Sequence, residues 1–234
     1  MIVRIILLIL YLCSHSTSYG QDIGEFTDPR DGQKYKTLTI PIRNRVPGLS
    51  TKMTIMIENL NYVLPGVYVY DDDASNRQPF GLLYEWDAAL VACPEGWRLP
   101  TKSDWLAFLQ QFGKMDLKGS PRGENYVGED GMHKLLMSQQ GWGSNNDENG
   151  SNKSRFNGIP GGGRKIRKGG RRKIQQEVRF EGMDFQGNWW SSTYNEYDVS
   201  SKDGAWSLYL NIDRVSIITS KIEESSLSCR CIKK

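Results

Sequence analysis

Histidine and cysteine are scarce in this sequence of 234 residues, and long hydrophobic runs are missing. Of the two histidines, only His133 lies beyond the first twenty residues, and no recognisable motif places a nucleophile or a metal ligand beside it. Triad chemistry and zinc chemistry that rely on histidine in such motifs therefore find no support. We expect a chain that binds rather than catalyses, with no cofactor, no metal site and no catalytic residue.

The longest apolar stretch is short and lies at the start of the chain. Residues 3–12 are apolar except for Arg4, whereas a helix that spans a membrane needs about 20 such residues. A short apolar segment next to a positive charge, followed by small and polar residues up to Gly20, is typical of a secretory signal peptide. We therefore expect residues 1–20 to be removed, the protein to be exported, and no transmembrane helix.

Cys13 leaves a second route to the cell surface open. A cysteine at the end of the apolar run could carry a lipid that tethers the protein to a membrane. The residue before it is Leu12, where a lipidation signal has a small side chain. We therefore favour a secreted or surface protein over a lipoprotein.

Three cysteines follow the leader, namely Cys93, Cys229 and Cys231. Export permits disulfides, and an odd number implies one bridge and one remaining thiol. The Cys-x-Cys pair could also begin a metal site, but no further cluster of Cys or His completes it. These observations alone leave the pairing open.

Charge is distributed unevenly along the chain, which carries 30 Lys and Arg against 27 Asp and Glu. Seven of the basic residues lie between Arg164 and Lys173, so the rest of the exported chain is mildly acidic. This run has no interleaved aromatic residues and no accompanying nucleic-acid motif, so we expect no nucleic-acid partner. A solvated or disordered insertion is the favoured interpretation of this run, and binding of an anionic surface polymer or lipid is the alternative.

Residue periodicity predicts an α+β fold in one domain over residues 21–234. Strands are predicted at 35–40, 54–60, 189–194, 206–212, 215–220 and 227–232. Helical spacing predicts helices at 82–92 and 101–112, and Thr101 with Asp104 resembles a capping box at the start of the second. Residues 113–186 show little regular pattern.

Aromatic residues are abundant, with seven tryptophans and eleven tyrosines. Three tryptophans in or between the predicted helices are expected in the core: Trp86, Trp97 and Trp105. Trp189 and Trp190 point to opposite faces of a predicted strand, so we expect one in the core and the other, Trp190, on a ligand surface. Trp142 is a similar candidate.

The segment from Ser144 to Asn149 is rich in oxygen-bearing side chains, which are the ligands that calcium prefers. The EF-hand pattern is absent, and so are the E-P-N and W-N-D signatures of calcium-dependent lectins. We therefore expect a solvated loop.

Several motifs follow one another in order along residues 28–231. They are D-P-R-D-G-Q-K-Y-K-T at 28–37, E-N-L-N-Y at 58–62, F-G-L-L-Y-E-W at 80–86, A-C-P-E-G-W-R-L-P-T at 92–101 with Asp104 and Trp105, F-N-G-I-P-G-G at 156–162, W-W-S-S-T at 189–193 and S-C-R-C at 228–231. Together they resemble the Fibrobacter succinogenes major paralogous domain family. The sequence departs from the family pattern at Ile55, where tryptophan is usual, and at the basic insertion 164–179.

The resemblance implies a C-type-lectin-like fold, with two helices, small antiparallel sheets and long irregular loops. It also implies a bridge between Cys93 and Cys231, which leaves Cys229 free. The R-L-P-T-x-x-x-W segment is similar to one in formylglycine-generating enzymes, whose reaction needs a pair of reactive cysteines. With the bridge formed only one thiol remains, so we do not expect an enzyme.

In this fold the long loops carry recognition, here residues 142–190. We name four candidate ligand-binding residues: Trp142, Asn157, Arg164 and Trp190. The expected function is an exported binding module for carbohydrate or another surface polymer. The alternatives are a structural or adhesion component of the envelope without a small ligand, and a degenerate relative of the formylglycine-generating enzymes.

Overall fold

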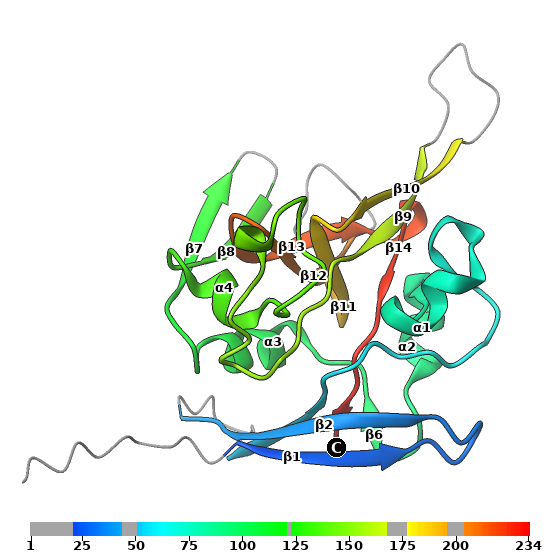
Figure 1. Ribbon diagram of the computed structural model, residues 1–234, viewed down its shortest axis with the longest axis horizontal. Coiled ribbons are helices and arrows are strands. Elements are labelled where there is room, and N and C mark those ends of the chain that lie inside the picture. The colour runs from blue at the N-terminus through cyan, green and yellow to red at the C-terminus, as the bar shows by residue number, and fades with distance from the viewer. Residues whose placement is uncertain (1–20, 44–50, 121–122, 168–176, 196–203) are drawn as a thin grey trace, which may run out of the picture.

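The computed structural model describes residues 21–43, 51–120, 123–167, 177–195 and 204–234 (Figure 1). The predicted leader with Cys13 lies outside these residues, as does the stretch 168–176 of the basic run. Strands dominate the described residues and the helices are short, which agrees with the predicted α+β class. No helix in these ranges is long and apolar enough to cross a bilayer.

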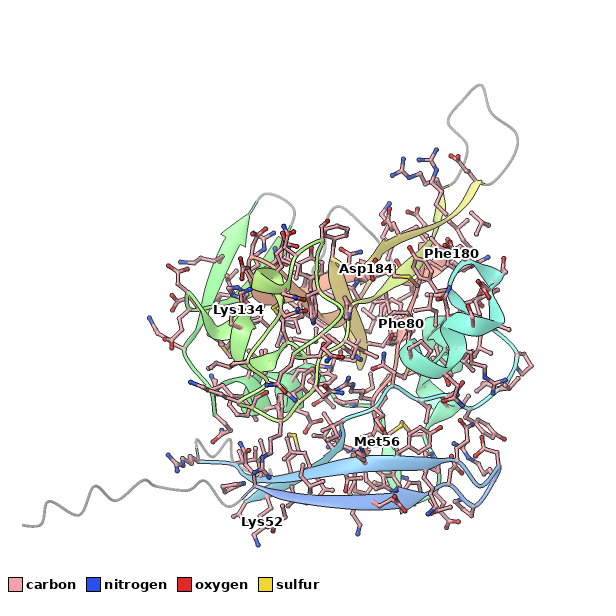
Figure 2. The ribbon with its side chains drawn as sticks, viewed as in Figure 1. Lys52, Met56, Phe80, Lys134, Phe180 and Asp184 are labelled. Atoms are coloured by element: carbon pink, nitrogen blue, oxygen red, sulfur yellow. A yellow bond between two sulfur atoms is a disulfide. The ribbon has the colours of Figure 1, made fainter. Side chains whose placement is uncertain are left out.

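The first sheet contains the earliest and the last described strands. Its order is β1 (Asp22–Thr27), β2 (Lys34–Pro41), β3 (Lys52–Met56), β15 (Ile232–Lys233) and β6 (Trp97–Arg98). It forms the lower layer of Figure 1, and Met56 lies between this layer and the rest of the molecule (Figure 2). The strand predicted at 35–40 is confirmed, whereas β1 was missed because its residues are mostly exposed and polar.

The second sheet has ten strands. Its main path is β4 (Val67–Tyr68), β5 (Leu83–Tyr84), β14 (Ser225–Ser228), β9 (Gly161–Arg167), β11 (Gln186–Asn195), β12 (Gly204–Asn211), β13 (Val215–Lys221), β8 (Gly123–Gly128) and β7 (Met115–Ser120), while β10 (Glu177–Met183) pairs with β9. Strands β11, β12 and β13 confirm three of the predicted strands. The strand predicted at 227–232 is divided between β14 and β15, because the chain passes there from one sheet to the other.

Helices are confined to short segments. They are α1 (Arg77–Phe80), α2 (Trp86–Ala92), α3 (Lys102–Leu109) and α4 (Met132–Leu136), with 3₁₀ turns η1 (Tyr70–Asp72), η2 (Ala74–Asn76), η3 (Asn146–Glu148) and η4 (Ile222–Glu224). The two predicted helices correspond to α2 and α3. The capping box of α3 is confirmed, since the Asp104 amide donates to Thr101 Oγ1 (3.1 Å) and the Thr101 amide donates to Asp104 Oδ2 (2.7 Å).

Strand β11 separates two hydrophobic cores. Trp189 is buried in the core that contains Trp105 and Phe156, and Trp190 is buried in the core that contains Tyr84. Successive side chains of a strand point to opposite faces, so these neighbours fill both cores at once. Each buried aromatic contributes roughly 1.5–3 kcal/mol to stability.

A disulfide joins the end of α2 to the start of the last strand. Cys93 and Cys231 have a Cα–Cα distance of 5.8 Å and a sequence separation of 138, and Cys229 is a free, buried thiol. This confirms the pairing that the family resemblance implied. Burial raises the pKa of the Cys229 thiol well above its ordinary value, so this thiol is protonated at neutral pH.

The prediction of an irregular stretch over 113–186 is wrong in part. Strands β7 and β8 pair as one hairpin, and β9 and β10 pair antiparallel as well. The alternation of apolar residues is weak there because β7 lies at a sheet edge and β9 begins with three glycines. The basic run begins inside β9, where Arg164 is only 9% exposed, so its first residues are not a solvated insertion.

Candidate functional site

Trp142 and Trp190, two of the predicted ligand-binding residues, are 1% and 0% exposed. The indole N–H of Trp142 donates to Ser138 Oγ and to the carbonyl of Gly158 (both 3.0 Å). The indole N–H of Trp190 donates to the carbonyl of Tyr84 (2.7 Å). The proposal that these rings stack on a ligand is therefore wrong for this structure, because both rings are used up in packing and internal hydrogen bonds.

Among the tryptophans expected in the core, Trp97 and Trp105 are buried. Trp86 is only half-buried, and its indole N–H donates to the carbonyl of Ser191 (2.9 Å). Trp86 packs against the core that contains Tyr84 without being fully buried, so the prediction holds in part; α2 begins at this residue rather than at Leu82.

The other two candidates, Asn157 and Arg164, lie in different surroundings. The guanidinium of Arg164 stacks on the ring of Tyr68, with Cζ 3.8 Å from the ring centroid. Asn157 lines a surface pocket that the structure places between the first sheet and α1. The structure thus does not bring the four predicted residues together, and Asn157 is the one that leads to a site.

Asn157 belongs to a polar groove made of two adjoining pockets of about 200 and 540 Å³. Both pockets are lined by Gln33, Asn61 and Gln78, which makes them continuous. Other polar side chains that line one pocket or the other are Asp31, Lys34, Glu58, Tyr62, Arg77 and Asn157. We call this surface the amide groove, because side-chain amides run along its length.

Hydrogen bonds hold the walls of the amide groove in place. Gln33 Nε2 donates to Asp31 Oδ2 (2.6 Å) and to the carbonyl of Asn61 (2.8 Å). Arg77 Nε donates to Asn61 Oδ1 (2.7 Å). The groove is therefore preorganised, which lowers the entropic cost of binding a ligand.

Tyr35 supports the same wall from below. Its hydroxyl oxygen accepts a hydrogen bond from the Asn61 amide (3.1 Å). Burial raises the pKa of Tyr35 to about 12, so the phenol stays neutral over the physiological range.

Asn59 forms the floor of the groove and makes four hydrogen bonds. Its Nδ2 donates to the carbonyl of Phe80 (2.8 Å) and to Ser228 Oγ (3.2 Å). Its Oδ1 accepts from Trp189 Nε1 (2.8 Å) and from Arg230 Nε (2.9 Å). Asn59 is 6% exposed, so this amide fixes the structure beneath the groove rather than reaching a ligand.

Arg230 is a fully buried cation behind the groove. Its guanidinium donates to the carbonyls of Phe156 and Asn157, the latter at 2.8 Å, and lies over the ring of Phe156 at 4.2 Å. Burial lowers the pKa of Arg230 to about 9, which still leaves it protonated at neutral pH. Arg230 thus anchors the backbone that presents Asn157 to the groove.

The backbone of Asn157 has a positive φ of 53°, in the left-handed region that asparagine tolerates better than most residues. The Asn157 amide donates to Asn152 Oδ1 (2.8 Å), and Asn152 has a positive φ of 49° itself. Strained backbone of this kind persists only where its surroundings hold it, and such residues cluster at functional sites.

The amide groove offers both hydrogen-bond donors and acceptors, since each Asn or Gln side chain carries an NH₂ group and a carbonyl oxygen. Within the described ranges, no three His, Cys, Asp or Glu side chains are grouped so as to hold a metal ion. In the oxygen-rich segment 144–149, Lys134 Nζ (Figure 2) donates to the backbone carbonyls of Asp147, Glu148 and Asn149 at 2.8–3.2 Å. These oxygens are therefore already engaged by a side-chain cation of the protein.

Sequence reasoning did not name Gln33, Asn61, Arg77 or Gln78 as site residues. The motifs at 28–37 and 58–62 contain two of them, and they were used only to support the family resemblance. The signal that could have directed attention to this surface is that both motifs are rich in polar side chains.

Comparison with models of known protein families gives a match to one family. The model of the family described as Fibrobacter succinogenes major domain matches residues 32–233. No curated protein and no solved structure matches the chain.

Proposed function

Because the chain belongs to the Fibrobacter succinogenes major domain family, we propose that it is an exported, non-catalytic binding module that holds a hydroxyl-rich surface polymer, carbohydrate above all, in the amide groove. The observation that carries this proposal is the pair of adjoining pockets that share Gln33, Asn61 and Gln78. Sugar hydroxyls donate and accept hydrogen bonds, and side-chain amides do the same. A long groove suits a chain of sugar units better than one compact molecule.

The proposal includes a C-type-lectin-like fold and export. The bridge between Cys93 and Cys231 supports the fold, because it ties the end of α2 to the last strand as the resemblance implies. The same bridge supports export, because disulfides persist in oxidising compartments and are rare in the cytosol. N-terminal sequencing of the secreted protein is expected to begin at Gln21, and an acylated Cys13 would replace export of a free protein with a lipoprotein.

Gln78 gives the sharpest test of the groove. It is exposed, and both pockets are lined by it, so Gln78→Ala removes a groove amide with little effect on folding. A glycan array and affinity electrophoresis in gels containing polysaccharides would identify a ligand. Loss of one hydrogen bond is expected to weaken binding roughly 2- to 13-fold. Gln139→Ala, at another exposed glutamine that does not line the groove, is the matched control.

Two results would count against the proposal. Binding that Gln78→Ala leaves unchanged would place the ligand elsewhere on the molecule. Absence of binding to every glycan and polysaccharide tested would favour a structural component of the envelope instead.

A further inference from the structure

A second pocket, of about 280 Å³, lies on the ten-stranded sheet near the start of α2. The residues that matter for its chemistry are Glu85, Trp86, Asp87, Ile166, Glu223 and Ser226. We call it the Trp86 pocket. Its volume is near the lower end of the roughly 300–1,000 Å³ range of small-molecule sites, which suits a ligand of few atoms.

Trp86 gives the pocket a flat aromatic wall. Six of the seven tryptophans are buried, and Trp86 is the exception. The bond from its indole N–H to the carbonyl of Ser191 (2.9 Å) fixes the plane of the ring. Tyr194, which is 37% exposed, has its ring centroid 6.1 Å away and extends this aromatic surface.

One residue of the pocket lining, Ser226, carries a buried hydroxyl that has no hydrogen-bond partner among the described residues. Ser226 is 1% exposed. Its cross-strand partner Arg164 does not line the pocket, and the Arg164 guanidinium stacks on Tyr68 instead. Buried polar groups are nearly always paired, and an exception in a pocket points to a ligand group that pairs with it.

Carboxylates provide acceptors on the other side of the pocket. Glu85 is held in place, because its Oε1 accepts a hydrogen bond from the hydroxyl of Tyr68 (2.7 Å). Asp87 and Glu223 are exposed carboxylates at the rim. The pocket therefore combines one unpaired buried hydroxyl with carboxylates and an aromatic wall.

This combination selects the class of ligand. A cation would satisfy the carboxylates but offers no acceptor to the Ser226 hydroxyl, and an anion would be repelled by the three carboxylates of the lining. A hydroxyl both donates and accepts, so it suits both sides, and the C–H face of a sugar ring packs on an indole. We propose that the Trp86 pocket binds one neutral sugar unit, a second carbohydrate site separate from the amide groove; this rests on the proposed function.

Acrylamide quenching of tryptophan fluorescence tests the proposal, because Trp86 is the accessible indole. The probes are four methyl glycosides, those of glucose, mannose, galactose and N-acetylglucosamine, at millimolar concentration. At least one is expected to protect the fluorescence from acrylamide, and Trp86→Phe should abolish this protection. If none of the four protects the native chain, or if protection persists in Trp86→Phe, the proposal is overturned.

Ser226→Ala separates binding from folding. The Ser226 hydroxyl has no partner in the described part of the chain, so its removal should leave the urea midpoint nearly unchanged. Affinity for the protecting glycoside should fall roughly 2- to 13-fold, whereas Ser144→Ala, outside the pocket, should have no effect. If Ser226→Ala does not fold, Asp87→Asn at the exposed rim serves instead, and unchanged affinity in the variant that folds would contradict the proposal.

The proposals for the amide groove and for the Trp86 pocket can be rejected separately. Polysaccharide binding that depends on Gln78, with no glycoside effect on Trp86, would keep the proposed function and reject the second site. Glycoside binding that depends on Trp86 but not on Gln78 would keep the second site and reject the role of the groove.

Discussion

Replacing Arg230 by leucine should lower the free energy of unfolding by about 2–5 kcal/mol. Its guanidinium donates to Asn59 Oδ1 and to the carbonyls of Phe156 and Asn157. Asn59 Oδ1 keeps its bond from Trp189, but the two carbonyls lose the donor that the structure shows. A buried acceptor left without a partner costs about 1–3 kcal/mol.

The unfavourable burial of the Arg230 charge limits how much stability the substitution can remove. Burial of the charge is itself unfavourable, as the lowered pKa of Arg230 indicates, and leucine removes that cost. The three charge-assisted hydrogen bonds, each of about 1.5–3 kcal/mol, outweigh it in the native chain. Arg230→Lys should therefore be as damaging as Arg230→Leu, because lysine keeps the buried charge and loses the planar fork.

Urea denaturation under non-reducing conditions, with the disulfide intact, would measure both variants. Arg179→Leu is the control, because Arg179 is exposed and its ion pair with Glu177 lies at the surface. Stability of Arg230→Leu within about 0.5 kcal/mol of the native chain would refute the argument, since surface changes have effects of that size. If Arg230→Lys were as stable as the native chain, the role assigned to the planar guanidinium group would be refuted.

Three further outcomes follow from the structure. Reduction of the Cys93–Cys231 bridge, or its removal by double alanine substitution, should cost about 4–5 kcal/mol in the chain-entropy model, measured as the shift in urea midpoint, because the bridge closes a loop with a sequence separation of 138. Thr101→Ala should cost about 1 kcal/mol by thermal unfolding, through loss of the capping box of α3. Burial would raise the pKa of Asp104, but hydrogen bonds from Arg98 and Thr101 outweigh it and hold the pKa below its ordinary value of 3.8. The stabilisation that the ionised Asp104 carboxylate gives the fold is therefore complete above pH 3.8 and is lost as the pH falls through the pKa of the folded state. The stability difference between the native chain and Asp104→Asn should shrink in acid, and a constant difference would contradict this.

The parts of the fold that follow from local pattern could be predicted. Helices α2 and α3 have apolar spacing, and the capping box states where α3 begins. Strands β11, β12 and β13 carry dense apolar and aromatic residues, because they lie in the middle of the second sheet. The disulfide pairing came from the family resemblance and not from the spacing of the cysteines.

The parts that depend on long-range pairing could not be predicted. Strand β1 is polar and exposed, and it is defined by its pairing with β2 rather than by its own composition. In β9, three glycines and a basic segment read as a loop, yet pairing with β10 and β14 makes them a strand.

The candidate site shows the same limit. Aromatic residues were predicted to face a ligand, but Trp142 and Trp190 are needed to fill two cores. Asn157, which was predicted to bind a ligand, lines a surface pocket, although its neighbour Phe156 in the same motif is buried in a core. Gln33 and Gln78 line the same pocket only because the folded chain brings the start of β2 and α1 to one surface, which no local pattern encodes.

Calorimetric titration of the Asn157→Gly variant tests the central claim most directly, with a polysaccharide that the native chain binds and at low and physiological ionic strength. Glycine accepts the positive φ of this position, so the variant removes the groove amide without straining the backbone. The account predicts binding roughly 2- to 13-fold weaker than that of the native chain, with affinities that change little with salt. Unchanged affinity in Asn157→Gly would contradict it by placing the ligand outside the groove, and native binding that disappears as salt is raised would contradict it by assigning the interaction to the basic run.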